Sequence, residues 1–307
     1  MEQVTVLMST YNGEKYLEEQ INSILNQENV KVTLIIRDDG SSDNTLKILK
    51  RYKDEDKLIF YRGENLGPAK SFFNLLNSKY VKSDNSNMYY AFSDQDDVWK
   101  ENKLYRAIKI LNMQQYKNIP SLYCADFQRI DENGNKLKNN FHFTTSTFNF
   151  SVVCSYCTGC TMVFNTQLYK KILNKIPSKM VMHDDWIHKV CLAIGGRVYF
   201  DSNYRAVLYR QHYGNVVGSR RGIFTKINNL YQRLFISRDS MLKEYQEIRL
   251  MYYPDIPEKN KKVINEVIDY KSKSFISRIK FLNKKIFRVK PFRLRKEFIL
   301  GIIFKTY

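Results

Sequence analysis

The chain opens with the apolar run Val4-Thr5-Val6-Leu7-Met8-Ser9, which ends at the turn signal Thr10-Tyr11-Asn12-Gly13. Apolar and β-branched residues bounded by a turn are typical of a buried strand. Apolar residues then recur at helical spacing over residues 17–25, and a second apolar run, residues 32–37, stops at Asp38-Asp39-Gly40. We therefore predict a strand, a helix and a second strand up to this point.

The same plan repeats along the next part of the chain. Helical spacing covers residues 46–52, apolar runs cover residues 58–61 and 88–92, and Gly67-Pro68-Ala69 opens a helix between them. Strands that alternate with helices predict βαβ units, and hence an α/β domain with a Rossmann-like, mainly parallel sheet flanked by helices. We predict that the same domain continues with a helix over residues 102–116 and a strand over residues 122–130.

Polar residues follow three of the predicted strands. They are Thr10 and Tyr11 after the first strand, Asp38 and Asp39 after the second, and the cluster Ser93-Asp94-Gln95-Asp96-Asp97 after the fourth. Ligands of parallel α/β sheets bind at the carboxyl ends of the strands. We therefore expect these residues to gather on one rim of the sheet.

The composition is that of a folded protein without a membrane span. Hydrophobic residues make up 43% of the 307 residues and aromatic residues 14%, which excludes a disordered chain. No apolar run approaches the roughly 18 to 20 residues that cross a bilayer, and the first residues lack the charge and length pattern of a signal peptide. Five Cys do not suggest a secreted disulfide framework. These features predict a cytoplasmic protein.

The positive charge is concentrated at the carboxyl-terminal end. Residues 219–307 contain 22 Lys and Arg against 8 Asp and Glu, a net charge of +14 out of the chain's +19. Such a tail attracts an anionic partner, either a phospholipid surface or nucleic acid. The charges in the rest of the chain nearly balance, so the function of that part has to be inferred from its own motifs.

Asp94, Asp96 and Asp97 place three carboxylates within four positions. Like charges this close repel each other, and a divalent cation with oxygen ligands relieves the repulsion. The alternative is a solvated acidic turn that caps a helix beginning near Trp99. The place of the cluster on the ligand rim favours the cation.

Four ordered motifs resemble those of the family 2 glycosyltransferases. They are residues 4–12, Asp38-Asp39-Gly40-Ser41-Ser42-Asp43, Glu64-Asn65-Leu66-Gly67 and Asp94-Gln95-Asp96-Asp97-Val98-Trp99. The resemblance covers residues 1–215, and residues 93–99 are similar in particular to rhamnosyltransferases of bacterial surface polysaccharides. It implies a GT-A catalytic domain over residues 1–218, with inverting, nucleotide-sugar-dependent chemistry, followed by a basic helical region over residues 219–307.

The resemblance also implies roles on the donor side. The family holds the nucleotide base beside Thr10, Tyr11, Asp38 and Asp39, where a carboxylate accepts the imide N–H of uracil or thymine and a Tyr ring stacks. As single residues, Asp38 and Asp39 also fit a turn and a helix cap. The Asp-x-Asp motif implies Mn²⁺ or Mg²⁺ on the diphosphate, with Asp96 and Asp97 as ligands and Asp94 as an adjacent contributor. Lys70 reaches toward the base or diphosphate, or is simply a solvated helix residue.

A second acidic motif, His183-Asp184-Asp185, implies the catalytic base. The family commonly has Glu-Asp at this place, and Asp184 aligns best as the group that deprotonates the acceptor hydroxyl. The change to His183 leaves Asp185 as an alternative base, and a helix cap as an alternative role for Asp184. His212 lies in a stretch similar to the family's closing loop, where a His completes the metal shell.

Cys154, Cys157 and Cys160 have C-x₂-C spacing, which invites a zinc or iron–sulfur interpretation. We reject it because no fourth ligand lies at a suitable spacing. The stretch from Thr158 to Phe164 instead resembles the family's glycine loop, in which small residues let the backbone approach the donor sugar and the acceptor.

Basic and apolar residues are interleaved at roughly helical spacing from Arg278 onward, which favours helices on an anionic membrane surface. A helical appendage packed on the domain, or on another copy in a homo-oligomer, is the alternative. The expected reaction moves a sugar, L-rhamnose from dTDP-L-rhamnose being the candidate, to a saccharide or lipid-linked saccharide acceptor. It occurs in the cytoplasm, at the inner face of the cell membrane.

Two rival functions are weaker. A nucleic-acid-binding protein would use the basic tail, but the carboxylate clusters would repel phosphate, so we expect no nucleic-acid partner. A nucleotidyltransferase on a related sheet fits less well because the acidic motif at residue 184 suits activation of an acceptor.

Overall fold

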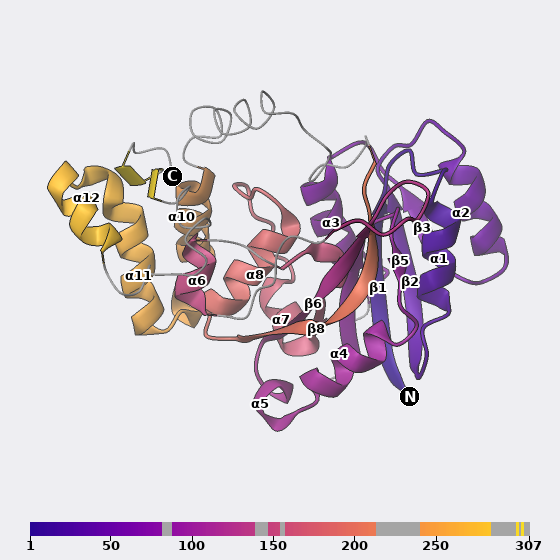
Figure 1. The fold of residues 1–307 in the computed structure, drawn as a ribbon, viewed down its shortest axis with the longest axis horizontal. Coiled ribbons are helices and arrows are strands. Elements are labelled where there is room, and N and C mark those ends of the chain that lie inside the picture. The colour runs from indigo at the N-terminus through magenta and orange to yellow at the C-terminus, as the bar shows by residue number, and fades with distance from the viewer. Residues whose placement is uncertain are drawn as a thin grey trace.

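A sheet of eight strands in the order β3-β2-β1-β4-β7-β6-β8-β5 runs through the computed structural model (Figure 1). The structure describes residues 1–81, 88–138, 147–153, 157–212, 240–283, 299–300 and 302–303. The strands are β1 (Glu2–Thr10), β2 (Val30–Asp38), β3 (Ile59–Arg62), β4 (Met88–Ser93), β5 (Val98–Trp99), β6 (Ser121–Ile130), β7 (Val163–Asn165) and β8 (Arg197–Arg210). Pairing is parallel except where β7 meets β4 and β6 and where β5 meets β8. The prediction of a mainly parallel α/β sheet is confirmed.

The helices in the first two thirds of the chain mostly follow strands in the predicted alternation. They are α1 (Leu17–Leu25), α2 (Thr45–Asp54), α3 (Pro68–Leu76), α4 (Lys103–Leu111), α5 (Gln114–Lys117), α6 (Phe148–Val153), the 3₁₀ turn η1 (Gly159–Thr161), α7 (Thr166–Ile172) and α8 (His183–Ala193). The carboxyl-terminal part adds α10 (Ser240–Tyr252), η3 (Tyr253–Asp255), α11 (Glu258–Ile268), η4 (Asp269–Ser272) and α12 (Phe275–Leu282).

Helices cover both faces of the sheet, which explains why its strands are continuous apolar runs. In β1, Leu7 packs into a core with α3, α6, α7 and α8, whereas Val6 and Met8 pack into a second core with α1, α2 and α4. Successive side chains of a strand point to opposite faces, so both sets are buried. Figure 1 shows α1 and α2 on one side of the sheet and α8 with the carboxyl-terminal helices on the other.

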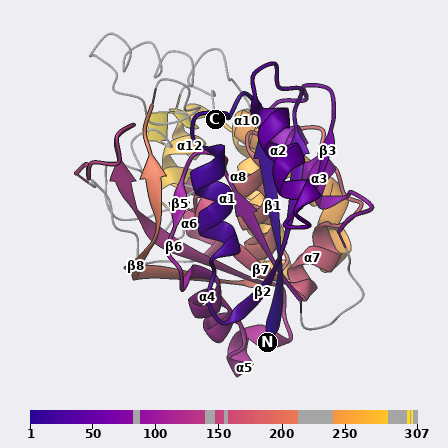
Figure 2. The ribbon, with the colours of Figure 1, turned by 90° about the vertical axis from the view of Figure 1, so that its right-hand side faces the viewer.

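The carboxyl-terminal helices share the larger core. Tyr245 and Ile248 of α10 and Ile264 of α11 are fully buried in the same cluster as Trp186 of α8. Figure 2 shows these helices behind the sheet when α1 is in front. Trp186 is therefore a packing residue of this core.

Two predicted boundaries differ from the structure. The helix expected over residues 102–116 is divided into α4 and α5, because Met113 adopts an extended conformation between them. Residues 98–99 form β5, paired with β8, so the helix after the acidic cluster begins at Lys103 rather than near Trp99. Among the described residues, none of the helices combines the length and apolar character needed to cross a bilayer.

Candidate active site

The strand ends that carry the predicted donor residues meet at one edge of the sheet. In the parallel ladder, Thr10 of β1 pairs with Asp38 of β2, and Met8 pairs with Ser93 of β4. The order of strands also reverses here, since β2 lies on one side of β1 and β4 on the other. This edge is thus the switch point at which such sheets bind ligands, as the sequence predicted.

Hydrogen bonds of the Gln95 side chain link the end of β1 to the acidic loop that follows β4. Its Oε1 accepts hydrogen bonds from Thr10 Oγ1 (2.6 Å) and from the backbone N–H of Tyr11 (2.8 Å), and its Nε2 donates to the Tyr11 carbonyl (3.0 Å). The Tyr11 side chain remains 48% exposed. Sequence reasoning named Thr10 and Tyr11 but missed Gln95, whose central place between the acidic residues was the available signal.

Asp38 and Asp39 are buried and each organises a turn. Asp38 Oδ2 accepts from the N–H groups of Gly40 (3.2 Å) and Ser41 (3.0 Å). Asp39 accepts from the N–H groups of Leu66 and Gly67, both at 2.9 Å, and forms an ion pair with Arg37 of β2. These contacts join the second and third motifs into one structure.

Arg37 is a buried cation beside these turns, and sequence reasoning did not single it out. It is 2% exposed and also donates to Ser71 Oγ (2.9 Å) and to the Glu64 carbonyl (2.8 Å). Lys70 lies nearby on α3, where its side chain is exposed. Nothing in the described contacts assigns Lys70 a partner or a ligand.

Asp96 and His212 come together at the rim. Asp96 Oδ2 lies 2.7 Å from His212 Nε2, and the two side chains are 14% and 20% exposed. The end of β8 holds the acidic loop in place, because Arg210 donates from its backbone N–H to Asp97 Oδ1 (3.0 Å) and from Nε to the Asp96 carbonyl (2.9 Å). The carboxylate is an oxygen ligand of the kind that Mn²⁺ and Mg²⁺ prefer, and the imidazole nitrogen is a ligand for divalent transition metals.

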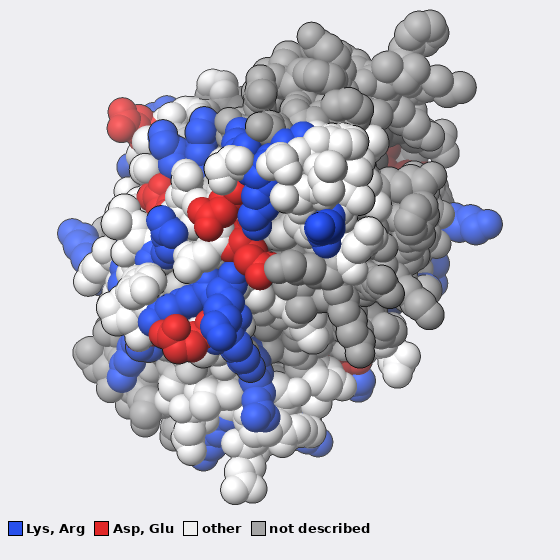
Figure 3. Space-filling model, turned by 90° about the vertical axis from the view of Figure 1, so that its left-hand side faces the viewer, with Lys and Arg blue, Asp and Glu red and all other residues white. Residues whose placement is uncertain are grey.

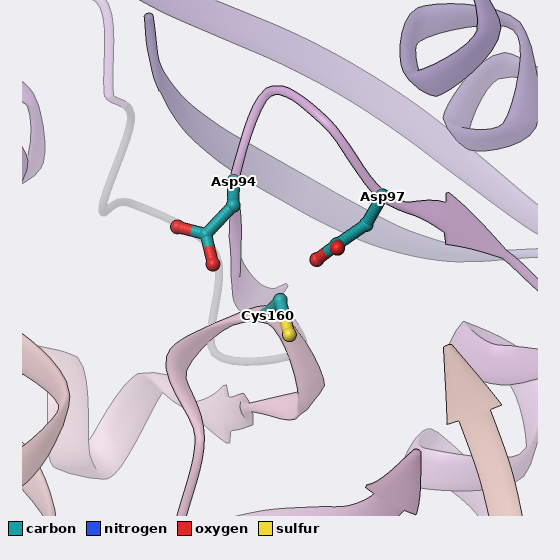
Figure 4. Close-up of side chains that lie close together, drawn as sticks. All are labelled: Asp94, Asp97 and Cys160. Carbon is teal, nitrogen blue, oxygen red and sulfur yellow. The ribbon is translucent and has the colours of Figure 1, made fainter. Parts of the chain in front are cut away.

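Asp97 lies in a different cluster. It is 1% exposed, and its carboxylate shares a region with those of Asp94 and the Cys160 thiol, their ligand atoms lying within 4.8 Å of one another (Figure 4). Burial, with the charge of Asp96, raises the pKa of Asp94 to about 7. The structure therefore separates two groups that the sequence treated as one: Asp96 with His212, and Asp97 with Asp94.

Two of the cysteines of the C-x₂-C stretch face different neighbours. Cys160 faces Asp94 and Asp97, whereas Cys157 is buried beside Cys124. Cys154 lies outside the described residues. The small residue of the stretch, Gly159, belongs to η1 and has a separate role beside the second acidic motif.

Asp184 lies in the first turn of α8, where two backbone N–H groups hold its carboxylate. Oδ2 accepts from Gly159 (3.0 Å) and Oδ1 from Asp185 (2.8 Å). Burial, with the charge of Asp185, raises the pKa of Asp184 to about 6. The charge of Asp184 in turn raises the pKa of Asp94, so the acidic motif of α8 lies close to the loop after β4.

Asp185 points to another partner. Its Oδ2 accepts from Lys189 Nζ (2.6 Å), and the same ammonium donates to Glu244 Oε2 of α10 (2.7 Å). Lys189 and Glu244 are fully buried. Sequence reasoning missed this network, because its two halves are 55 residues apart.

His183 is packed rather than exposed to a substrate. Its ring stacks on Phe72, with 3.8 Å between centroids, and meets Phe92 edge-on at 5.0 Å. Burial lowers its pKa to about 3, so the ring is neutral at physiological pH. A Cβ atom on Gly159 would lie 2.9 Å from His183 Nε2 and 3.4 Å from Asp184 Cβ, which explains why glycine occupies this position.

Comparison with known sequences places this architecture in a family. Residues 5–173 match the family described as Glycosyl transferase family 2. Over 251 residues the chain is 28% identical to the dTDP-rhamnosyl transferase RfbG of Shigella flexneri, covering 77% of this chain and 81% of that protein. It is 34% identical over 110 residues to the putative teichuronic acid biosynthesis glycosyltransferase TuaG of Bacillus subtilis, covering 35% of this chain and 41% of that one.

Solved structures share the fold. Residues 1–349 of TarS from S. aureus, in complex with UDP, superpose with a TM-score of 0.58 at 16% identity, over 99% of this chain and 89% of that one. The mannosyltransferase PcManGT from Pyrobaculum calidifontis, in complex with GDP-Man and Mn²⁺, gives 0.53 at 14% identity, over 98% and 85%. With more than half of its residues matched to the family, the chain belongs to glycosyl transferase family 2.

Proposed function

We propose that the protein transfers a sugar from a nucleotide sugar to a saccharide acceptor with inversion of the anomeric carbon, and that Asp184 is the general base. The observation that carries this proposal is the placement of Asp184. Its carboxylate lies close to the acidic loop at the switch point, held by the N–H groups of Gly159 and Asp185. A pKa of about 6 leaves it ionised at neutral pH, near the value at which a carboxylate is an efficient proton acceptor.

The donor nucleotide lies across the ends of β1, β2 and β4. The exposed Tyr11 ring stacks on the base, and the turn residues Asp38 and Asp39 shape the base pocket next to Thr10. The exposed Lys70 lies in the first turn of α3 and supplies positive charge for the diphosphate. Asp94 and Asp96 border the diphosphate from the acidic loop.

Asp96 and His212 hold a divalent cation, Mn²⁺ or Mg²⁺, and Asp97 is the further ligand that the sequence motif implies. The 2.7 Å approach of a carboxylate oxygen to an imidazole nitrogen supports the first two. Asp97 would need to turn from its buried position beside Cys160 to join them. When bound, the cation neutralises the diphosphate and stabilises it as a leaving group.

Transfer then needs one proton acceptor on the opposite side of the sugar. Asp184 takes the proton of the acceptor hydroxyl while that oxygen bonds to the anomeric carbon and the nucleoside diphosphate departs with the electron pair of the broken bond. Asp185 does not compete for this role, because Lys189 holds its Oδ2 and its Oδ1 is buried. His183 does not compete either, since it is neutral and enclosed by Phe72 and Phe92.

The donor that we propose is dTDP-L-rhamnose, and the acceptor is a growing, lipid-linked surface polysaccharide in a bacterial cell. Support comes from the similarity to RfbG over most of both chains and from the shorter match to TuaG. A nucleoside diphosphate with thymine or uracil suits the Tyr11 ring and the carboxylates beside it.

We propose that the carboxyl-terminal helices bind the inner face of the cell membrane. On α12, Phe275, Ile276 and Ile279 are 55%, 67% and 40% exposed, and Lys271, Lys273 and Lys280 surround them in the sequence. Figure 3, which views this end of the molecule, shows Lys and Arg in excess of Asp and Glu. Exposed apolar residues with a basic border suit an anionic phospholipid surface. A homo-oligomer contact is the alternative use of this surface.

The direct test is a panel of nucleotide sugars, including dTDP-L-rhamnose and UDP-N-acetylglucosamine, with and without Mn²⁺. We expect release of nucleoside diphosphate from one donor class, dependent on the cation and lost in Asp184→Asn. Release from no donor would refute the proposed function, and a product that retains the donor's anomeric configuration would refute the single-displacement mechanism.

A further inference from the structure

The buried ion network Asp185–Lys189–Glu244 connects the second acidic motif to the carboxyl-terminal region. Lys189 Nζ lies 2.6 Å from Asp185 Oδ2 and 2.7 Å from Glu244 Oε2, and neither Lys189 nor Glu244 has any solvent exposure. The Tyr245 ring lies 5.6 Å from the same ammonium. A buried charge is tolerated only when it is paired, so these three side chains fix one another.

Glu244 also holds the segment that leads into α8. Its second oxygen, Oε1, accepts a hydrogen bond from the N–H of Val181 at 2.7 Å. One carboxylate therefore bonds to the chain just before α8 and, through Lys189, to the second turn of that helix. The start of α8 is clamped from both sides by a residue of α10.

The start of α8 is where Asp184 receives its two hydrogen bonds. Lys189 lies four residues after Asp185 and holds its side chain, and the backbone N–H of Asp185 donates to Asp184 Oδ1. A shift of this turn would change the direction of the Asp184 carboxylate relative to Gly159, which lies on a separate element. The clamp therefore acts on the direction of the carboxylate, not on its chemistry.

We propose that Glu244 is a positioning residue for sugar transfer, which acts through Lys189 and Asp185 to aim Asp184 at the acceptor. This inference rests on the proposed function of Asp184. It makes α10 part of the acceptor side of the active site and not merely an appendage. The donor side does not share these contacts, so donor binding is independent of the clamp.

The test compares two variants of the full chain that lie one helical turn apart. Glu244→Gln keeps an oxygen for the Val181 N–H but removes the charge that pairs with Lys189. Glu247→Gln is the matched control, because Glu247 bonds at the surface to the N–H and hydroxyl of Ser178 and does not contact Lys189. The reaction followed is release of nucleoside diphosphate from dTDP-L-rhamnose or UDP-N-acetylglucosamine, with Mn²⁺ present and water as the acceptor.

We expect Glu244→Gln to lower kcat by roughly tenfold to a hundredfold, the usual effect of a misdirected catalytic group, while KM for the donor stays within about twofold. Glu247→Gln should match the wild type. Glu244→Asp, which keeps the charge at a shorter reach, should recover part of the loss and serves as the readout if Glu244→Gln does not fold.

Two results would overturn the inference. In the first, Glu244→Gln has the same kcat as the control variant. In the second, Glu244→Gln loses activity only because KM for the donor rises, while kcat is unchanged. Neither result bears on the proposed sugar transfer, which is refuted if the wild type itself releases no nucleoside diphosphate.

Discussion

Replacing Asp184 with Asn should lower the rate of sugar transfer and raise the stability of the folded protein. The carboxylate is the proposed base, but its charge is costly in a buried position. Asn has nearly the same shape but cannot accept the acceptor's proton. We expect transfer to fall by about 10² to 10⁴ while donor affinity changes little, since the donor contacts lie on other elements. The fall should be much smaller in Asp185→Asn.

The effect on stability can be worked out from the pKa of Asp184. Burial raises this pKa from 3.8 to about 6, so the folded protein binds the proton more tightly than the unfolded chain does. The raised pKa corresponds to roughly 3 kcal/mol. Below pH 3.8 the carboxyl is protonated in both states and costs nothing; the wild type loses stability as the pH rises through the folded pKa, and the full penalty applies above about pH 6.

Asn carries no charge at any pH and escapes this penalty. Between pH 4.5 and pH 8, the advantage of Asp184→Asn over the wild type in free energy of unfolding should therefore grow by about 2 kcal/mol, the part of the full penalty that builds up in this window. Urea unfolding at several pH values measures the difference. A constant difference across the range would refute the raised pKa, and wild-type transfer by the variant would assign the proton to another group.

Four further outcomes follow from the same geometry. Transfer should rise about tenfold per pH unit below pH 6 and level off above it, because only the ionised base acts; a flat pH–rate profile would contradict this. Gln95→Ala should weaken binding of thymidine or uridine diphosphate by several-fold in calorimetry, since two strand ends lose their cross-link, whereas Gln115→Ala on α5 should not. Adding EDTA, or replacing Asp96 with Asn, should weaken the same binding, and equal affinity in EDTA would remove the cation from the mechanism. Ile276→Glu should reduce binding to vesicles of anionic phospholipid by about fivefold or more in a salt-sensitive manner, with Ile59→Glu on the distant strand β3 as the control; unchanged binding would favour a contact between subunits.

The parts of the fold that the sequence predicted are those with local causes. The strands before Thr10 and Asp38 are short apolar runs closed by turn residues, and their parallel register brings the two polar ends together without further information. The break between α4 and α5 escaped prediction, because apolar spacing continues through Met113 while the backbone does not. The spacing of apolar residues indicates which face of a helix is buried, but it does not indicate where the helix is interrupted.

The candidate site was predictable as a set of residues but not as an arrangement. Asp96 and Asp97 are adjacent in sequence, and neighbouring side chains in an extended or turning backbone point in different directions, so one meets His212 and the other faces Cys160. Our proposal of Asp184 rather than Asp185 as the base rests on Lys189, which holds Asp185 and whose second partner is on α10. A contact between residues so far apart in the sequence leaves no local pattern from which it could be predicted.

The two acidic motifs support the proposal that a cation accompanies the donor. The pKa of Asp94, on the loop after β4, is raised by the charges of Asp96 beside it and of Asp184 on α8, so the two acidic motifs lie within one field of negative charge. A diphosphate would add further negative charge to that field and would be repelled unless a cation entered with it or before it.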